Sequence, residues 1–191
     1  MTKDELSPLA LPTSRISRLL LTARSQSQWH IRSGAPNATQ DFDFAFMKEL
    51  LGKADIRALI PHSGLMCLLD GVIEWDDRAI VCVSDSHRDP ANPLRRDGQL
   101  AAVHVLEYAA QATAVHGGLR AKAADETAPP GYLAAVRDVQ LHVARLDDLV
   151  SPLRIHATRL FGETANVIYE CKVTAADLAI AEARITIMLR A

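Results

Sequence analysis

Residues 99–121 read QLAAVHVLEYAAQATAVHGGLRA, a stretch of more than twenty residues that contains no proline and no alternation of apolar with polar positions. It is rich in alanine and leucine, two strong helix formers. Apolar residues would lie on all sides of a helix built from this stretch, and such a helix is typically buried. The pattern predicts one long, buried helix.

Apolar, partly β-branched runs lie on both sides of this predicted helix. The two runs before it are joined by Asp76-Asp77-Arg78, which is a hairpin signal. The six expected strands are residues 66–75, 79–85, 132–145, 152–161, 166–175 and 178–190. One long helix laid across one face of an antiparallel sheet is a stable two-layer arrangement. The sequence therefore predicts an α+β domain.

The N-terminal part differs in composition from the rest of the chain. No acidic residue occurs between Glu5 and Asp41, where arginines are interleaved with serines. This bias is compatible with a disordered tail, a start site placed too early, a targeting segment or a partner-binding arm. We expect residues 1–46 to be an extension and residues 47–191 to form the domain, with one or two short helical turns before Pro61.

The composition limits the functions that the chain can carry. Its 191 residues are 49% hydrophobic, enough to bury one core, and the net charge of -2 provides no basic field for nucleic acid. The scattered cysteines Cys67, Cys82 and Cys171 suit buried thiols of a reducing compartment rather than a zinc site. No apolar run reaches the roughly 18 residues that span a bilayer. We expect a soluble, cytoplasmic protein without a membrane span.

Two segments resemble one enzyme family. Residues 59–70 read LIPHSGLMCLLD, similar to the L-P-H-R-x-P-x-L-L-x-D opening of hotdog-fold 3-hydroxyacyl-carrier-protein dehydratases. Residues 105–111 read VLEYAAQ, similar to the I-E-x-x-A-Q stretch on their central helix. Residues 142–145, HVAR, resemble a later strand of the divergent dehydratases of aryl-polyene pigment clusters. The resemblance implies a hotdog fold, in which an antiparallel sheet wraps around one long central helix.

The sequence departs from the family at one position that matters for catalysis. The main fatty-acid dehydratases carry a catalytic histidine in G-H-F-P-x-x-P-x-x-P-G ahead of the helix, and Pro93 occupies that position here. The aryl-polyene type diverges at the same place, so the departure is consistent with that branch. The usual pair of catalytic groups is therefore incomplete.

Glu107 is the main candidate for proton transfer. The resemblance places it at the catalytic glutamate of the family, and an unpaired carboxylate on a largely apolar helix is costly unless it serves a function. His62 is the second catalytic candidate, because in the family the first motif lines the mouth of the acyl tunnel. Gln111 and His104 lie one turn from Glu107 on the same helical face. We expect both to contact the carboxylate or the substrate, with a purely structural role open for each.

Other polar residues have less specific interpretations. His87 is expected in a loop, and His116 is expected near the helix end, where a cation complements the helix dipole. Arg95 and Arg96 are expected to be a solvated loop pair or to meet an acidic carrier protein. Free N–H groups at residues 98–101 are expected to face the thioester oxygen if the substrate approaches there.

Together, these residues and the resemblance predict a dehydratase that converts 3-hydroxyacyl-carrier-protein thioesters to trans-2-enoyl thioesters in a fatty-acid- or aryl-polyene-like pathway. The implied partners are an acyl carrier protein bearing a phosphopantetheine-linked acyl chain and a second hotdog subunit, identical or different, since hotdog domains pair their edge strands. No cofactor is expected, and no metal, because His104 and Glu107 lack a second His-carboxylate set. A hotdog acyl thioesterase and a non-catalytic hotdog subunit of a heterodimeric dehydratase are the alternatives.

Overall fold

The computed structural model describes residues 50–162 and 165–190. The predicted extension, residues 1–46, and its boundary with the domain lie outside the described residues. The helices and strands, in chain order, are β1 (Leu51–Gly52), α2 (Lys53–Arg57), β2 (Gly71–Trp75), β3 (Ala79–Ser84), α3 (Val105–Ala123), β4 (Gly131–Leu141), β5 (Leu153–Gly162), β6 (Asn166–Ala175) and β7 (Leu178–Leu189).

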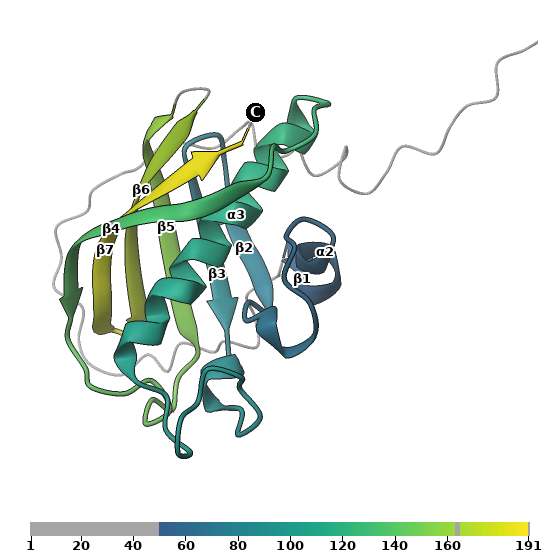
Figure 1. Ribbon diagram of the computed structural model, residues 1–191. Coiled ribbons are helices and arrows are strands. Elements are labelled where there is room, and N and C mark those ends of the chain that lie inside the picture. The colour runs from purple at the N-terminus through teal and green to yellow at the C-terminus, as the bar shows by residue number, and fades with distance from the viewer. Residues whose placement is uncertain (1–49, 163–164, 191) are drawn as a thin grey trace, which may run out of the picture. The chain divides into compact units, whose positions relative to one another are not determined.

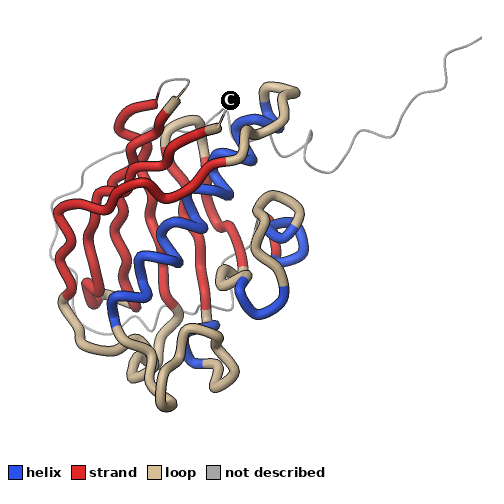
Figure 2. The backbone as a smooth tube through the Cα atoms, viewed as in Figure 1, coloured by secondary structure: helices blue, strands red, loops and turns tan. Residues whose placement is uncertain are grey.

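The described strands form one antiparallel sheet in the order β1-β2-β3-β5-β6-β7-β4. Figures 1 and 2 show α3 lying across one face of this sheet, which curves around the helix. The predicted α+β arrangement of a sheet wrapped around one long helix is thus confirmed. No helix in the described ranges is long and apolar enough to cross a membrane.

Strand β5 shows how the sheet buries one face. Leu153, Ile155 and Ala157 are fully buried, whereas Arg154 and His156 between them are partly exposed. This alternation follows from the two-residue period of a strand, which sends successive side chains to opposite faces. Full burial of a large aliphatic side chain stabilises a fold by about 1.5–3 kcal/mol. The buried face of the sheet and the helix that covers it therefore form the core.

Helix α3 is buried on one side only. Val105, Tyr108 and Val115 are buried in the core, whereas Ala114 is exposed and Ala110 is partly exposed. The prediction of a helix buried all round is wrong, because the sheet covers only one side. The other side of α3 is also apolar, because it lines a groove.

The helix begins later than the sequence predicts. The backbone N–H of Ala102 donates to the carbonyl of Ala144, and the N–H of Leu146 donates to the carbonyl of Leu100, at 2.9 and 2.8 Å. These bonds hold the chain before the helix beside the HVAR segment, so α3 starts only at Val105. The same pairing shortens β4, which the sequence predicts to run through this segment.

Asp147 fixes this pairing. Its carboxylate accepts a hydrogen bond from the N–H of Leu100 at 2.8 Å and forms ion pairs with Arg145 and Arg95. The Arg145 guanidinium holds the pKa of Asp147 well below its usual range. The Arg95 side chain is largely buried and also donates to three backbone carbonyls. The predicted solvated pair is therefore wrong for Arg95, whereas Arg96 is exposed.

The strand predicted at residues 66–75 begins only at Gly71. The reason is that the N–H of Leu68 donates to the side-chain oxygen of Gln111 on α3, not to a neighbouring strand. This part of the first motif is attached to the helix, and it lies between β1 and β2 in the chain. The attachment places the motif next to the helix residues that share the family resemblance.

The sequence predicts His87 in a loop and His116 near the end of the helix, but both side chains are buried. His116 lies inside α3, with Nδ1 2.8 Å from the hydroxyl of Tyr169 and Nε2 2.8 Å from the carbonyl of Asp76. A carbonyl only accepts, so Nε2 carries the proton and Nδ1 accepts from the tyrosine. His87 is fully buried in a short turn. Burial lowers the pKa of both histidines, so both are neutral at pH 7.

We expect the free energy of unfolding to fall as the pH is lowered from about 7.5 to about 5.5. In the unfolded chain both histidines titrate near 6.5, and their pKa in the fold is lower. Below about pH 6.5 the unfolded state therefore binds more protons, so stability that is complete above this pH is progressively lost on acidification. Urea denaturation at several pH values measures the slope. His116→Gln should make it shallower, and an unchanged slope would contradict the role given to His116.

Candidate active site

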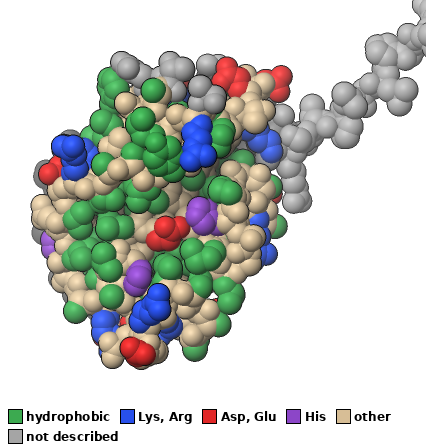
Figure 3. Space-filling view, in the orientation of Figure 1, with side chains coloured by type: hydrophobic (Ala, Val, Ile, Leu, Met, Phe, Trp, Pro, Cys, Tyr) green, Lys and Arg blue, Asp and Glu red, His purple; other side chains and the backbone are tan. Residues whose placement is uncertain are grey.

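The exposed side of α3 forms part of a groove with a volume of about 750 Å³. The helix contributes mainly small side chains to its lining, from Ala110, Ala114, Gly117, Gly118 and Ala121. The strands contribute larger apolar ones, from Leu133, Val167, Tyr169, Ile187 and Leu189. Figure 3 shows acidic and histidine surface within the mainly hydrophobic surface of this face. The groove is therefore an apolar channel with a small polar region.

Glu107 and His62 lie together in the polar part of the lining, which also includes Thr113, Arg120 and Glu126. Oε1 of Glu107 lies 3.2 Å from Nε2 of His62 and 2.9 Å from Nε2 of Gln111. The side chains of Glu107 and His62 are each 31% exposed, so the carboxylate is only partly sheltered. Among the described residues, no hydrogen bond reaches the second oxygen, Oε2. The structure thus brings three of the four predicted site residues together, and leaves one carboxylate oxygen free.

Gln111 holds Glu107 in place. Its side chain is fully buried, its oxygen accepts from the N–H of Leu68 at 2.9 Å, and its nitrogen donates to the carbonyl of Met66 at 2.8 Å as well as to Glu107. Both N–H groups of the amide are therefore used. Gln111 is not among the described residues that line the groove. Its position suits a residue that orients the carboxylate better than one that contacts substrate.

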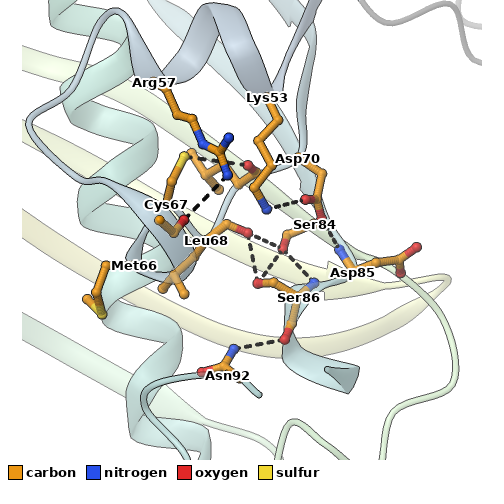
Figure 4. A network of polar contacts seen from close by, with 12 residues as sticks. Lys53, Arg57, Met66, Cys67, Leu68, Asp70, Ser84, Asp85, Ser86 and Asn92 are labelled. Atoms are coloured by element: carbon orange, nitrogen blue, oxygen red, sulfur yellow. Dashed lines mark hydrogen bonds and ion pairs between the residues drawn. The ribbon is translucent and has the colours of Figure 1, made fainter. Parts of the chain in front are cut away.

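Leu68 is also fixed from the side opposite the helix. Its carbonyl accepts hydrogen bonds from the hydroxyls of Ser84 and Ser86, at 2.6 and 2.8 Å. Asp70 ends the first motif and pairs with Lys53 at 2.7 Å. Figure 4 shows these contacts joining Leu68 and Asp70 of the motif to Lys53 and to the chain at the end of β3. The first motif therefore has a structural role. Its hydrogen bonds attach the segment that contains His62 both to the sheet and to α3.

The ring of His62 has a polar neighbour on one side only. Nε2 lies 3.2 Å from Oε1 of Glu107, a contact that becomes an ion pair when the ring is protonated. Nδ1 is buried and has no partner among the residues that the structure describes. No hydrogen bond on Nδ1 orients the ring, so its orientation depends on Glu107 and on the packing of its own chain segment.

The other predicted groups are not part of the groove. His104 lies in the turn before α3, lines no part of the groove and forms no hydrogen bond with Glu107 within the described ranges. Its substrate-binding role stays a prediction. Pro93, at the position of the family histidine, is exposed in a loop. The N–H groups of Leu100 and Ala102 are bonded to Asp147 and to a backbone carbonyl, so they are not free to bind a thioester oxygen.

Metal-ligand geometry is also absent from the part of the chain that the structure describes, where no group of three or more His, Cys, Asp or Glu residues is placed to hold an ion.

The sequence pattern of the ApeP-like family, described as ApeP dehydratase, matches residues 54–190. The chain belongs to the ApeP-like dehydratase family. Among solved structures, it is similar to the dehydratase heterocomplex ApeI:P from Xenorhabdus doucetiae, with a TM-score of 0.64 and 23% sequence identity over 71% of this chain and 91% of that chain. No curated protein matches the sequence. These findings confirm the predicted relationship to hotdog-fold dehydratases of the aryl-polyene type.

Thioesterase structures share the fold of this ApeP-like chain. The putative thioesterase from Shewanella oneidensis is similar with a TM-score of 0.52 and 11% identity, over 73% of this chain and 94% of that chain. Zebra fish thioesterase superfamily member 2 is similar with a TM-score of 0.50 and 16% identity, over 72% and 95%. At such identities the likeness concerns the fold alone. It confirms the predicted hotdog architecture.

The groove wall on α3 was not predicted from the sequence. Small residues recur at Ala110, Ala114, Gly117 and Ala121, three or four positions apart, which is the spacing of one helical face. The sequence alone predicts that these residues belong to a helix that is apolar on all sides. The two faces differ in their large side chains: these four groove positions carry only Ala and Gly, whereas the core face carries Val105, Tyr108 and Val115 beside its alanines.

Gln111→Leu should destabilise the fold by about 2 kcal/mol or more. The substitution keeps the side-chain volume, but it leaves the N–H of Leu68 and the carbonyl of Met66 buried without partners, and each such group costs about 1–3 kcal/mol. Urea denaturation measures the change. Thr113→Val is the matched control on the same helix, because the Thr113 hydroxyl bonds only to the carbonyl of Ala110 within the helix. Equal losses for the two variants would contradict the anchoring role of Gln111.

Proposed function

We propose that this protein dehydrates 3-hydroxyacyl groups, carried as thioesters on an acyl carrier protein, to trans-2-enoyl groups. One observation carries the proposal: in a mainly apolar groove, Oε1 of Glu107 accepts a hydrogen bond from Gln111 and lies 3.2 Å from Nε2 of His62, while Oε2 has no hydrogen-bond partner among the described residues. An anchored carboxylate with one free oxygen is suited to transfer protons to and from a bound chain. Membership of the ApeP-like dehydratase family supports elimination of water as the reaction.

The free oxygen of Glu107, Oε2, can carry out both proton transfers of the dehydration. Oε2 of Glu107 takes a proton from C2 of the acyl chain, the electrons of that C–H bond form the C2=C3 double bond, and the C3–O bond breaks. The departing hydroxyl takes the proton back from Oε2 and leaves as water. The carboxylate is regenerated, and no other reactant is consumed. Gln111 donates to Oε1 and His62 lies 3.2 Å from the same oxygen, so both contacts keep the carboxyl group in one orientation through both transfers.

The lining of the groove suits the substrate. A 3-hydroxyacyl chain is apolar beyond its thioester and hydroxyl, and ligand pockets bury such chains against apolar walls with few polar groups. The volume of about 750 Å³ lies within the range of pockets that hold small organic ligands. The small residues along α3 leave space for the acyl chain of the substrate.

A second hotdog subunit is the proposed partner. Strand β4 pairs only with β7 among the described strands, so its other edge is unpaired. Apolar side chains along β4 are strongly exposed, among them Leu133, Val139 and Leu141. An exposed apolar edge is a template for strand pairing with another chain. The ApeI:P structure is described as a heterocomplex, which supports a different rather than an identical partner.

Glu107→Gln should lower turnover at least about a hundredfold while keeping fold and assembly. The amide is nearly isosteric but cannot shuttle a proton. The measurement is the absorbance of the enoyl product formed from a 3-hydroxyacyl carrier protein, with the partner subunit present. His62→Ala should lower turnover by about tenfold, and more than His104→Ala, because His62 lies 3.2 Å from Glu107 and His104 forms no hydrogen bond or ion pair with it among the described residues. Wild-type turnover in Glu107→Gln would instead identify this chain as a non-catalytic subunit.

The same assay tests the thioesterase alternative. A dehydratase forms enoyl product without releasing free thiol, whereas a thioesterase that uses Glu107 to activate water releases the thiol of the carrier. Thiol release that is lost in Glu107→Gln, without enoyl formation, would replace the proposed reaction by hydrolysis.

Val139→Asp should weaken assembly with the second hotdog subunit by at least about tenfold in Kd, because it places a charge on the β4 edge. The matched control is Val150→Asp. Val150 is more exposed and lies in a loop away from any strand, so this change should leave assembly intact. Light scattering of the co-purified proteins measures the complex. Formation of a stable homodimer that does not bind the second subunit would contradict the proposed partner.

A further inference from the structure

Two adjacent glycines lie inside α3, although glycine in a helix costs about 1 kcal/mol relative to alanine. A Cβ added at Gly117 would meet nothing within 4 Å. A Cβ added at Gly118 would lie 3.3 Å from each of three atoms of Leu59, namely Cβ, Cδ2 and the carbonyl oxygen. The helix backbone therefore touches the chain before His62 at Gly118, with no room for a side chain.

The link between Leu59 and His62 is short and stiff. Only Ile60 and Pro61 separate them; Ile60 is buried in the core, and the ring of Pro61 fixes its own φ. The ring of His62 has no hydrogen bond on Nδ1 within the described residues. A shift of Leu59 is therefore passed to His62 with little to absorb it.

We propose that Gly118 is a positioning residue: by lacking a side chain, it sets the separation between α3 and the Leu59–His62 segment, and with it the contact of His62 with Glu107. The proposal rests on the proposed function for the catalytic meaning of that contact. Contacts of 3.3 Å are tighter than ordinary van der Waals contact, so an added methyl group pushes Leu59 away by a few tenths of an ångström. The 3.2 Å distance between His62 and Glu107 lengthens in response.

The first test needs no substrate. In NMR spectra of the full chain, Glu107→Gln should shift the Cε1–H resonance of His62, because it removes the carboxylate that faces the ring. We expect this response to be about half or less in a Gly118→Ala background, and to keep its size in a Gly117→Ala background. Both backgrounds gain the same helix propensity, so only the Leu59 contact differs. An equal response in all three backgrounds would overturn the proposal even if the protein proves to be a dehydratase.

The second test uses turnover of the complex with its partner. Gly118→Ala should lower kcat by about tenfold with KM changed less than about twofold, since misplacement of a catalytic group by about 1 Å can cost 10²-fold. His62→Ala should then cause a smaller further loss than it does in the wild type. Wild-type kcat, or an unreduced effect of His62→Ala, would overturn the proposal. If no substrate is turned over, only the proposed function fails and the NMR test decides.

A third variant covers the case in which Gly118→Ala does not fold. Leu59→Ala removes Cδ2, one of the three atoms that a Cβ added at Gly118 would meet, and so loosens the same packing without overcrowding it. It should also reduce the NMR response of His62 to Glu107→Gln. A full response in this variant would show that the contact between Leu59 and Gly118 does not position His62.

Discussion

The candidate site depends on one buried amide. Gln111 bonds at once to Leu68, to Met66 and to Glu107, so a single side chain joins the first motif to the carboxylate. A buried amide left with unmet hydrogen bonds would be strongly unfavourable, and this penalty makes the arrangement specific. Leu68 also accepts hydrogen bonds from Ser84 at the end of β3 and from Ser86 in the turn that follows. The network therefore connects the sheet to the helix.

The sequence was sufficient for the fold but not for the surroundings of the site. The long helix, the order of the strands and the pair Glu107 and His62 were all predictable, because helical propensity, strand periodicity and two motifs report them directly. The late start of α3 was not, because it depends on Asp147, which lies in a distant part of the chain and captures the N–H of Leu100. Local propensity does not report such a tertiary contact.

The missing family histidine illustrates the same limit. The sequence shows that Pro93 stands at its position, and that His62 belongs to a motif, but no pattern states that His62 lies 3.2 Å from Glu107. That distance depends on the hydrogen bonds by which Gln111 holds the first motif against α3. These bonds join residues far apart in the chain, and only Gln111 could be proposed in advance, from its place one turn after Glu107.

The order of strands also determines when the groove can exist during folding. β4 directly follows α3 in the chain, yet its partner in the sheet is β7, the last strand. Strands that are far apart in the chain pair late in folding, because closing the long loop between them costs conformational entropy. On a ribosome, the helix with Glu107 is therefore made well before the groove wall, which waits for residues 178–189 to emerge. Until then the small-residue side of α3 is open to chaperones and to other nascent chains.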